Sequence, residues 1–193
     1  MMENEIFYCE SIASCKDNLM LIKGYKTAKK TGYGLERYLK EFAYEDEKEH
    51  MANTYLVKDK TSNELVGYFS VKAGMVSTSE RRNGLFTSFD AVPGIELANF
   101  GVNGEYKRNH NESVGIGKII FIDFILPICQ AAANIIGAKI LYIFALPYDE
   151  LIRYYNSLNF QRLSKKEEFQ VHRRIRPRYD TACIFMYRSI HGK

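Results

Sequence analysis

The hydrophobic positions of the chain form runs of two kinds, some with the period of an α-helix and others with the composition of a β-strand. Residues 35–49 carry apolar side chains at i, i+3, i+4 and i+7, which predicts one amphipathic helix over the whole stretch. Residues 54–58 and 65–71 are instead rich in β-branched and aromatic side chains, and polar turn-forming residues separate them. These two runs therefore predict an antiparallel hairpin.

The middle of the chain has the pattern of two buried strands joined by a helix. Residues 95–102 and 139–145 are almost continuously apolar, as strands covered on both faces are, and the apolar residues 119–136 lie between them. Pro127 should kink or split this helix, and Gly137 is suited to end it. The order predicts one parallel strand–helix–strand crossover.

The shorter runs complete the sheet. The polar residues 77–84 predict a loop. The other expected elements are strands at residues 6–12, 86–89, 169–171 and 181–188, a partly helical segment at 16–30 and a short helix at 149–158. The predicted fold class is α/β, in the form of an α+β mixed sheet that is mostly antiparallel, has one parallel crossover and is flanked by helices. We expect a single domain over residues 1–193.

Composition agrees with a cytoplasmic globular protein. The 193 residues are 46% hydrophobic, and Asp123 and Pro127 interrupt the longest apolar stretch, so we expect no membrane span and no membrane partner. The N-terminal residues include early acids and lack the pattern of a signal peptide. Four cysteines without C-x-x-C spacing and four scattered histidines predict reduced thiols and no metal site.

A glycine turn, Gly115-Ile116-Gly117-Lys118, opens the central helix. A helix N-terminus presents unpaired backbone N–H groups and partial positive charge, so this turn predicts an anion site. A phosphate-binding P-loop would need glycine in place of Glu112 and Ser or Thr in place of Ile119, and a dinucleotide fingerprint would need glycine in place of Ile120. Both are excluded, and a turn that only caps the helix remains the alternative.

Two motifs in the right order resemble the GNAT acetyltransferases. Residues 112–117, Glu-Ser-Val-Gly-Ile-Gly, are similar to the family's pyrophosphate loop, Gln/Arg-x-x-Gly-x-Gly/Ala, with Glu112 at its first position. Residues 151–160 resemble the family's final-helix signature, with Tyr155 on its tyrosine and Asn159 on its glycine. Asn tolerates the left-handed conformation at a helix end better than other non-glycine residues, so the exchange is mild.

A third segment supports the resemblance: residues 100–103, Phe-Gly-Val-Asn, followed by Tyr106, are similar to the strand end at which GNAT enzymes bind the pantetheine arm. The helix at 35–43 and the strand pair after it make the chain most similar to the toxin branch of the family, whose members acetylate aminoacyl-tRNA. The resemblance covers roughly residues 35–160.

The resemblance implies a GNAT fold and an enzyme that transfers acetyl from acetyl-CoA to a primary amine by direct attack, without a metal. It implies that a backbone N–H near Val102 polarises the thioester carbonyl and that Tyr155 protonates the leaving thiolate. The residues implied in coenzyme A binding are Phe100, Gly101, Val102, Val114, Gly115, Ile116, Gly117 and Lys118.

Two alternatives stay open. The toxin branch implies that the acceptor is an aminoacyl-tRNA and that an antitoxin protein is a partner. A non-catalytic acyl-CoA-binding module is the second alternative, and it is favoured if Glu112 disables the phosphate loop. A homodimer is compatible with either, since the sequence specifies no oligomeric state.

Glu96 is the candidate general base. Strand alternation places it on one face with Ala98, Phe100 and Val102, and burial there would raise the pKa of its carboxyl group. The alternative is a buried glutamate that a tyrosine or lysine satisfies. An aminoacyl α-amine, with a pKa of about 7.7–8 or lower, would hardly need a base, so the toxin reaction predicts that Glu96 is dispensable.

Positive charge is concentrated near the C-terminal end. Residues 165–178 contain six Lys and Arg and two Glu, a difference of +4 that equals the net charge of the whole chain, so the rest is close to neutral. Phe169 and Tyr179 lie among these cations. The segment predicts phosphate binding, with Arg173, Arg174 and Arg176 as candidate nucleic-acid contacts, and a solvated hairpin is the alternative.

Overall fold

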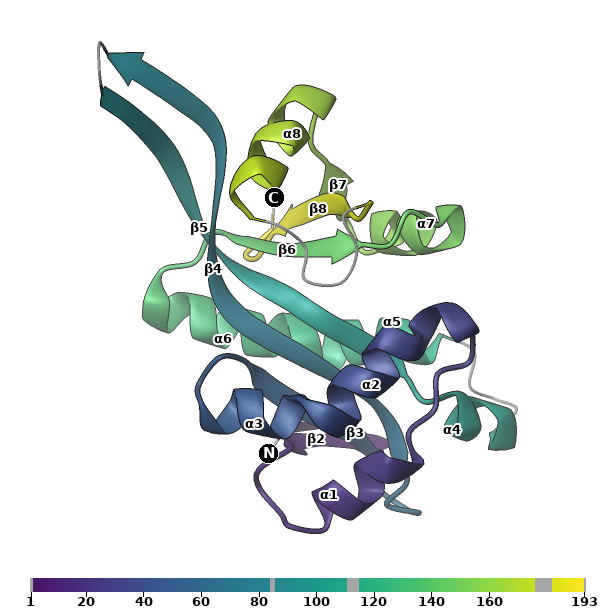
Figure 1. The fold of residues 1–193 in the computed structure, drawn as a ribbon. Helices are drawn as coiled ribbons and strands as arrows, with labels where there is room; N and C mark the ends of the chain where they lie inside the picture. Colours follow the sequence, from purple (N-terminus) through teal and green to yellow (C-terminus); the bar gives the residue numbers. More distant parts are fainter. Residues whose placement is uncertain (1, 84–85, 111–114, 176–181, 193) are drawn as a thin grey trace. The chain divides into compact units, whose positions relative to one another are not determined.

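The computed structural model describes residues 2–83, 86–110, 115–175 and 182–192 (Figure 1). Its eight strands form one sheet with the hydrogen-bonded order β1-β2-β3-β4-β5-β6-β8-β7, and β5 and β6 are a parallel pair. The predicted mixed sheet with one parallel crossover is therefore confirmed. The strands are β1 (Met2–Glu3), β2 (Phe7–Ser11), β3 (Asn53–Asp59), β4 (Leu65–Asn83), β5 (Phe86–Val102), β6 (Ile140–Ala145), β7 (Gln161–Arg162) and β8 (Ile184–Ser189).

The chain divides into two compact units, one made of residues 1–72 and 97–128 and the other of residues 73–96 and 129–193. In the first unit, β2 pairs antiparallel with β3, and β3 with the first part of β4, which confirms the predicted hairpin. The helical elements of this unit are α1 (Asn18–Leu21), η1 (Ile22–Gly24), η2 (Lys30–Gly32), α2 (Tyr33–Glu41), α3 (Ala43–Lys48), α4 (Gly104–Asn109), α5 (Ile116–Ile120) and η3 (Phe121–Ile125).

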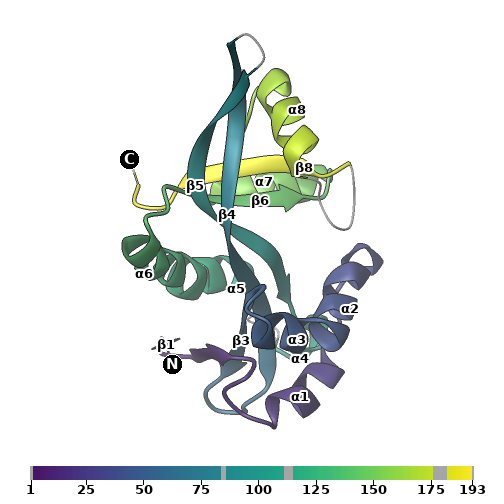
Figure 2. The same ribbon diagram turned by 60° about the vertical axis from the view of Figure 1, so that its left-hand side comes forward.

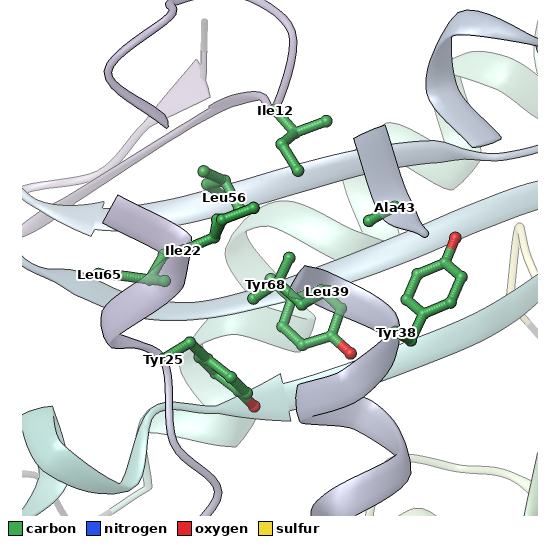
Figure 3. Close-up of a cluster of buried hydrophobic side chains, with 9 residues drawn as sticks. All are labelled: Ile12, Ile22, Tyr25, Tyr38, Leu39, Ala43, Leu56, Leu65 and Tyr68. Carbon is green, nitrogen blue, oxygen red and sulfur yellow. The ribbon is translucent and has the colours of Figure 1, made fainter. Parts of the chain in front are cut away.

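The core of the first unit forms where α1 to α3 cover one face of β3 and β4 (Figure 3). Burying this apolar surface is the main favourable contribution to folding of the unit. The cluster contains Ile12, Ile22, Tyr25, Tyr38, Leu39, Ala43, Leu56, Leu65 and Tyr68. It uses the apolar face that the 35–49 periodicity predicted, because Tyr38 and Leu39 both lie in it.

Residues 35–49 are helical as predicted, but they belong to two helices, α2 and α3, and not to one. The backbone leaves helical geometry at Phe42, where φ is −124°, and α3 begins at Ala43. The sequence has neither glycine nor proline at this point, so no local signal marks the break.

The central helix is continuous but irregular. Pro127 has no N–H to donate to the preceding turn, and its ring crowds the carbonyl there. The helix accommodates it by widening into a π-helical turn, η3, directly before α6 (Leu126–Ile136). The predicted split at Pro127 is therefore wrong, because the helical elements follow one another without a gap. Gly137 then follows with a φ of 73°, as expected of a residue that ends a helix.

The stretch Ile116–Ile136 is long and apolar enough to cross a membrane by length and composition, with a mean hydropathy of 2.0. The expectation that Asp123 and Pro127 leave no such stretch is therefore wrong. Ile120, Phe124 and Cys129 on this helix are buried inside the protein, and the core helix of a soluble protein passes the same test. Asp123 accepts a hydrogen bond from Asn4 Nδ2 at 2.7 Å.

The second unit is built on β6, which pairs in parallel with β5 and antiparallel with β8, while β7 pairs with the outer side of β8. Here the later part of β4 and the earlier part of β5 run side by side as a long ribbon in both views (Figures 1 and 2). The predicted loop at 77–84 is therefore wrong over residues 77–83, and the predicted short strand at 86–89 is the start of β5. Backbone pairing, which any side chain except proline allows, accounts for a strand of such polar sequence.

The basic segment near the C-terminal end is helical over most of its length. The predicted strand at 169–171 is wrong, because residues Lys165–Arg174 form a helix, α8, that packs on β8. The pair that closes the sheet is β7 with β8 instead. Ser164 and Glu167 form a capping box at the start of α8, with each side chain bonded to the backbone of the other residue. The predicted helix at 149–158 is confirmed as α7 (Asp149–Ser157).

Candidate active site

The end of β5 in the first unit is packed too closely for side chains at two glycines. A Cβ on Gly67 of β4 would lie 2.7 Å from the Gly101 carbonyl oxygen and 3.0 Å from Ile120 Cδ1. A Cβ on Gly101 would lie 2.2 Å from the hydroxyl oxygen of Tyr25. Gly67 therefore lies directly against both the end of β5, which is the predicted pantetheine strand, and Ile120 of α5, the helix that the predicted phosphate turn opens.

Asn103 continues this arrangement by anchoring the chain where β5 ends. Its backbone N–H donates to Val66 O at 2.8 Å, and its side-chain Nδ2 donates to Leu65 O at 2.8 Å. Its Oδ1 accepts from Glu105 N at 3.1 Å and caps α4. The predicted residues Phe100, Gly101 and Val102 thus occupy the last positions of β5, immediately before a buried anchor.

The glycine turn has the geometry of a helix entrance. Gly115 takes a φ of 86°, which disfavours other residues, and its surroundings leave open space where a Cβ would stand. Ile116 is buried in the core, whereas Lys118 is exposed one turn into the helix. Lys118 N donates to Gly115 O at 2.8 Å, whereas the N–H groups of Ile116 and Gly117 come too early in the helix for an intrahelical acceptor. With the Lys118 ammonium, these two N–H groups can bind an anion. Val114 and Glu112 lie outside the described residues.

The β5–β6 ladder is short. It joins Gly94, Ile95 and Glu96 to residues 140–142, and among the described residues the rest of β6 pairs with β8. Residues 97–102 of β5 continue beyond the described ladder. Backbone groups on that side of the strand are therefore outside the ladder, and an extended ligand can bond to such an edge.

Glu96 lies in the second unit, and its described neighbour is a tyrosine. Its Oε2 accepts a hydrogen bond from Tyr142 Oη at 3.3 Å, and the two residues are register partners on β5 and β6. Gly74 makes room for this contact, since a Cβ there would lie 2.0 Å from Tyr142 Oη. Burial, with the nearby carboxylate adding to it, raises the pKa of Tyr142. Ile95 and Leu97 are buried whereas Glu96 is half-buried, so its face of the strand is the more open one.

Tyr155 lies near the end of α7, 8% exposed. Its ring packs edge-on against Phe160 and Tyr154, with centroid distances of 5.5 and 5.3 Å. Burial raises the pKa of its hydroxyl group further above the ordinary value, at which a tyrosine is already protonated at neutral pH. Asn159 takes a φ of 64°, as predicted for the residue in the glycine position, and the turn it forms brings Phe160 back onto Tyr155.

The candidate nucleic-acid residues have different surroundings. Arg173 is exposed on α8, whereas Arg174 Nη1 donates to Ser77 O at 3.1 Å and to Gln170 O at 3.2 Å. Arg174 therefore ties α8 to β4, and its role as a nucleic-acid contact stays a prediction. Arg176 lies outside the described residues.

Several residues of this site were not predicted from the sequence. Gly67, Tyr25 and Tyr142 shape the strand end and the Glu96 surroundings, but each acts on a residue more than thirty positions away. A single sequence carries no signal for such pairs. Within the part of the chain that the structure describes, no group of three His, Cys, Asp or Glu side chains is placed to hold a metal ion.

At the level of sequence, no protein-family model and no curated protein matches the chain. At the level of structure, the chain has the same fold as two proteins of known structure, KacT and the toxin AtaT, and this is the fold that the resemblance implied. A tyrosine-to-phenylalanine mutant of KacT is similar with a TM-score of 0.68 and 12% identity, over 97% of this chain and 96% of its own.

AtaT is the second similar protein. Such a mutant of AtaT, bound to the C-terminus of the antitoxin AtaR and acetyl-CoA, gives a TM-score of 0.63 and 11% identity over 96% and 94% of the two chains. The structure of AtaT complexed with acetyl-methionyl-tRNAfMet is similar with a TM-score of 0.65 and 11% sequence identity, over 93% of each chain. At such identity these likenesses establish the fold.

Proposed function

We propose that this chain is an acetyl-CoA-dependent N-acetyltransferase that acetylates a primary amine by direct attack, without a covalent enzyme intermediate. The observation that carries the proposal is Tyr155, a buried tyrosine near the end of α7, in a fold that AtaT shares and in which AtaT binds acetyl-CoA. A protonated hydroxyl is what the departing thiolate needs.

The described residues of the first unit fit coenzyme A. Gly115 supplies the left-handed entrance to a helix and open space beside it, and Lys118 adds a cation, so Gly115, Ile116, Gly117 and Lys118 would hold the diphosphate. The backbone of Phe100, Gly101 and Val102 would hold the extended pantetheine arm. Val114 belongs to the same proposal as the residue before the turn.

Each residue then has one chemical task. Acetyl-CoA supplies a thioester carbonyl, to which the amine nitrogen bonds while the carbon–sulfur bond breaks. The backbone N–H near Val102 donates to the carbonyl oxygen, on which negative charge develops. Tyr155 delivers its proton to the departing sulfur, the amine releases a proton to solvent, and the tyrosine is reprotonated from solvent.

Glu96 has a conditional task. An acceptor amine with a pKa well above 7 must lose a proton before it attacks, and Glu96, bonded to Tyr142, is the group we propose as its base. An α-amine of about pKa 7.7–8 or lower is already largely neutral at slightly alkaline pH. For such an acceptor we expect Glu96→Gln to retain most of the activity.

We infer further that the acceptor is the α-amino group of an aminoacyl-tRNA and that the protein is a cytoplasmic toxin held inactive by an antitoxin. This narrower proposal is supported by AtaT, which has been solved with acetyl-methionyl-tRNAfMet and with its antitoxin AtaR, and by the cations of α8. The broader proposal does not depend on it.

Transfer of labelled acetyl from acetyl-CoA to charged tRNA and to small primary amines tests both levels. We expect label on the aminoacyl group, and a rate lowered about 10²- to 10⁴-fold in Tyr155→Phe. Tyr154→Phe is the matched control, because Tyr154 is the adjacent, partly buried ring on the same helix. Label on small amines alone would overturn the toxin proposal. Acetyl-CoA binding without transfer to any amine would establish the non-catalytic module instead.

A further inference from the structure

The outward face of α8 presents one aromatic ring between cations. Lys165, Phe169 and Arg173 are spaced i, i+4 and i+8, so they lie in one row along the helix, about 6 Å apart between successive residues. Phe169 is 61% exposed, and Lys165, Lys166 and Arg173 are exposed as well. Other large apolar side chains of the protein are also exposed, so the distinguishing feature of Phe169 is its place between cations on one helix face.

Both acids of the helix have described partners other than the cations of this row. Glu167 is held in the capping box by Ser164, whose hydroxyl and backbone N–H donate to Glu167 Oε2 at 2.7 and 3.1 Å. Glu168 turns toward the sheet, where it accepts from Phe185 N at 2.8 Å and pairs with Arg162 at 3.3 Å. Lys165, Lys166 and Arg173 make no ion pair with a residue that the structure describes.

The helix is rigidly mounted on its other face. Val171 is fully buried in a cluster with Val76, Ile140 and Phe185, and Arg174 bonds to Ser77 O. A fixed aromatic ring with cations one turn to either side matches an unpaired nucleobase and the phosphates on both sides of it. Stacking on a ring accepts any base, and the cations follow the backbone.

We propose that this face of α8, made of Lys165, Lys166, Phe169 and Arg173, binds single-stranded RNA, with an unpaired base stacked on Phe169 and adjacent phosphates contacted by the cations. The inference rests on the proposed function, because an aminoacyl-tRNA presents its acceptor group on a single-stranded 3′ end. It adds Lys165, Lys166 and Phe169 to Arg173 as residues that contact RNA.

A membrane surface is the competing partner for a basic helix with an exposed aromatic residue. A helix that lies in a membrane interface needs a broad apolar face directed outward. On α8 the outward face has Phe169 as its large apolar residue, while Val171 is turned into the core. The charge and the single ring therefore favour RNA.

The test measures binding of the full chain to a fluorescent single-stranded RNA dodecamer and to deacylated tRNA, by anisotropy over a range of salt concentrations. We expect Phe169→Ala to weaken binding about tenfold or more and Phe169→Tyr, which keeps a ring, to bind as the wild type does. Lys165→Gln with Arg173→Gln should lower the salt slope by about 1.4, since each lost contact to a single strand removes about 0.7. Lys16→Gln with Lys23→Gln, two exposed lysines far along the chain, removes the same charge and should leave the slope close to the wild-type value.

Three outcomes separate the inference from the proposed function. If Phe169→Ala loses RNA binding but keeps its thermal shift with acetyl-CoA and its transfer to small amines, the inference stands. Loss of RNA binding in a protein that transfers acetyl to nothing would uphold this surface and remove the proposed function. Equal RNA affinity of Phe169→Ala, Phe169→Tyr and the wild type would overturn the inference. The inference would also be overturned if the protein bound vesicles of phosphatidylserine and phosphatidylcholine through Phe169 and did not bind RNA.

Discussion

Position 101 of β5 has room for the hydrogen atom of glycine but not for a Cβ, because the side chain of Tyr25 lies against it. The hydroxyl oxygen of Tyr25 stands 2.2 Å from where a Cβ would be, and the next nearest atom of that ring, Cζ, stands at 3.4 Å. Tyr25 is fully buried, burial raises the pKa of its hydroxyl group, and no described residue accepts or donates a hydrogen bond there. The requirement for glycine at position 101 thus comes from one oxygen atom.

Gly101→Ala should therefore be rescued by a change at Tyr25. We expect Gly101→Ala alone to lower the free energy of unfolding by about 1–3 kcal/mol through overpacking. Tyr25→Phe alone should change it by less than about 1 kcal/mol, because the hydroxyl has no described partner to lose. Urea unfolding of the double variant should recover at least half of the loss, and strictly additive losses would contradict the contact.

A buried ion pair gives the first unit a dependence on pH. Lys58 and Glu10 are 5% and 13% exposed and are in contact, and Asn18 also bonds to the Lys58 ammonium. Burial alone would raise the pKa of Glu10, but the hydrogen bonds from Lys58 and Ser14 outweigh it and lower the pKa. The stabilisation is therefore complete above the unfolded pKa of about 4.3 and is lost as pH falls through the lower folded value.

Glu10→Gln should abolish this part of the acid sensitivity. At neutral pH the variant leaves a buried ammonium without its counter-charge, so we expect a loss of about 3 kcal/mol in the free energy of unfolding. The difference between variant and wild type should shrink as the pH is lowered below 4. Urea unfolding at pH 7 and pH 3.5 measures it, and a difference that is constant with pH would rule out the pair as its source.

Elements show where sequence patterns are informative and where they are not. Periodic or apolar segments such as α2, β3, β6 and α7 were predicted with the right type, because burial of one face imposes a pattern. The polar end of β4 was not, since backbone pairing places no demand on side chains. The α8 error had a readable signal in Ser164-Lys-Lys-Glu167, the spacing of a capping box, which outweighs the few strand-like residues at 169–171.

The capping box predicts a local effect. Ser164→Ala removes the acceptor for Glu167 N and a donor to its carboxylate, so α8 should lose about 1 kcal/mol of stability. Amide hydrogen exchange should become faster in residues 165–174 while the β6–β8 pairing keeps its protection. Ser164→Asp retains a capping oxygen and is the control, because Asp is also a preferred N-cap. Unchanged exchange in Ser164→Ala would mean that packing on β8 alone holds the helix.

For the candidate site, the sequence supplied the residues and the structure supplied their surroundings. The left-handed turns at Gly115 and Asn159 could be predicted from residue type, because few residues tolerate positive φ. The contacts of Gly67 with Gly101 and Ile120 could not, since they join three segments that are distant in sequence. Burial of Tyr155 and the pairing of Glu96 with Tyr142 likewise depend on the folded packing.

At the scale of the whole molecule, we propose that the two compact units form one domain. The chain passes between them at residues 72–73, 96–97 and 128–129, and each crossing lies inside a regular element, β4, β5 or α6. Domain boundaries normally lie in exposed linkers. The units should therefore unfold together, in one transition.

Calorimetry in the presence and absence of acetyl-CoA tests this expectation. We expect one transition, which saturating acetyl-CoA moves to higher temperature as a whole, because a ligand stabilises everything that unfolds with its site. Two transitions, with only one moved by the ligand, would show two domains. Coenzyme A without the acetyl group is the control for the contribution of the nucleotide part.

Because β4 and β5 each run from one unit into the other, part of the second unit is synthesised before the first unit is complete. When residue 128 has emerged, the first unit has all its segments, yet residues 73–96 are already made and wait for β6 and β8, which come more than ten and more than fifty residues later. During that interval the open edge of β5 at Gly94–Glu96 is a strand without its neighbour. Slow translation between residues 97 and 140 should therefore increase aggregation of the nascent chain, and fast translation there should protect it.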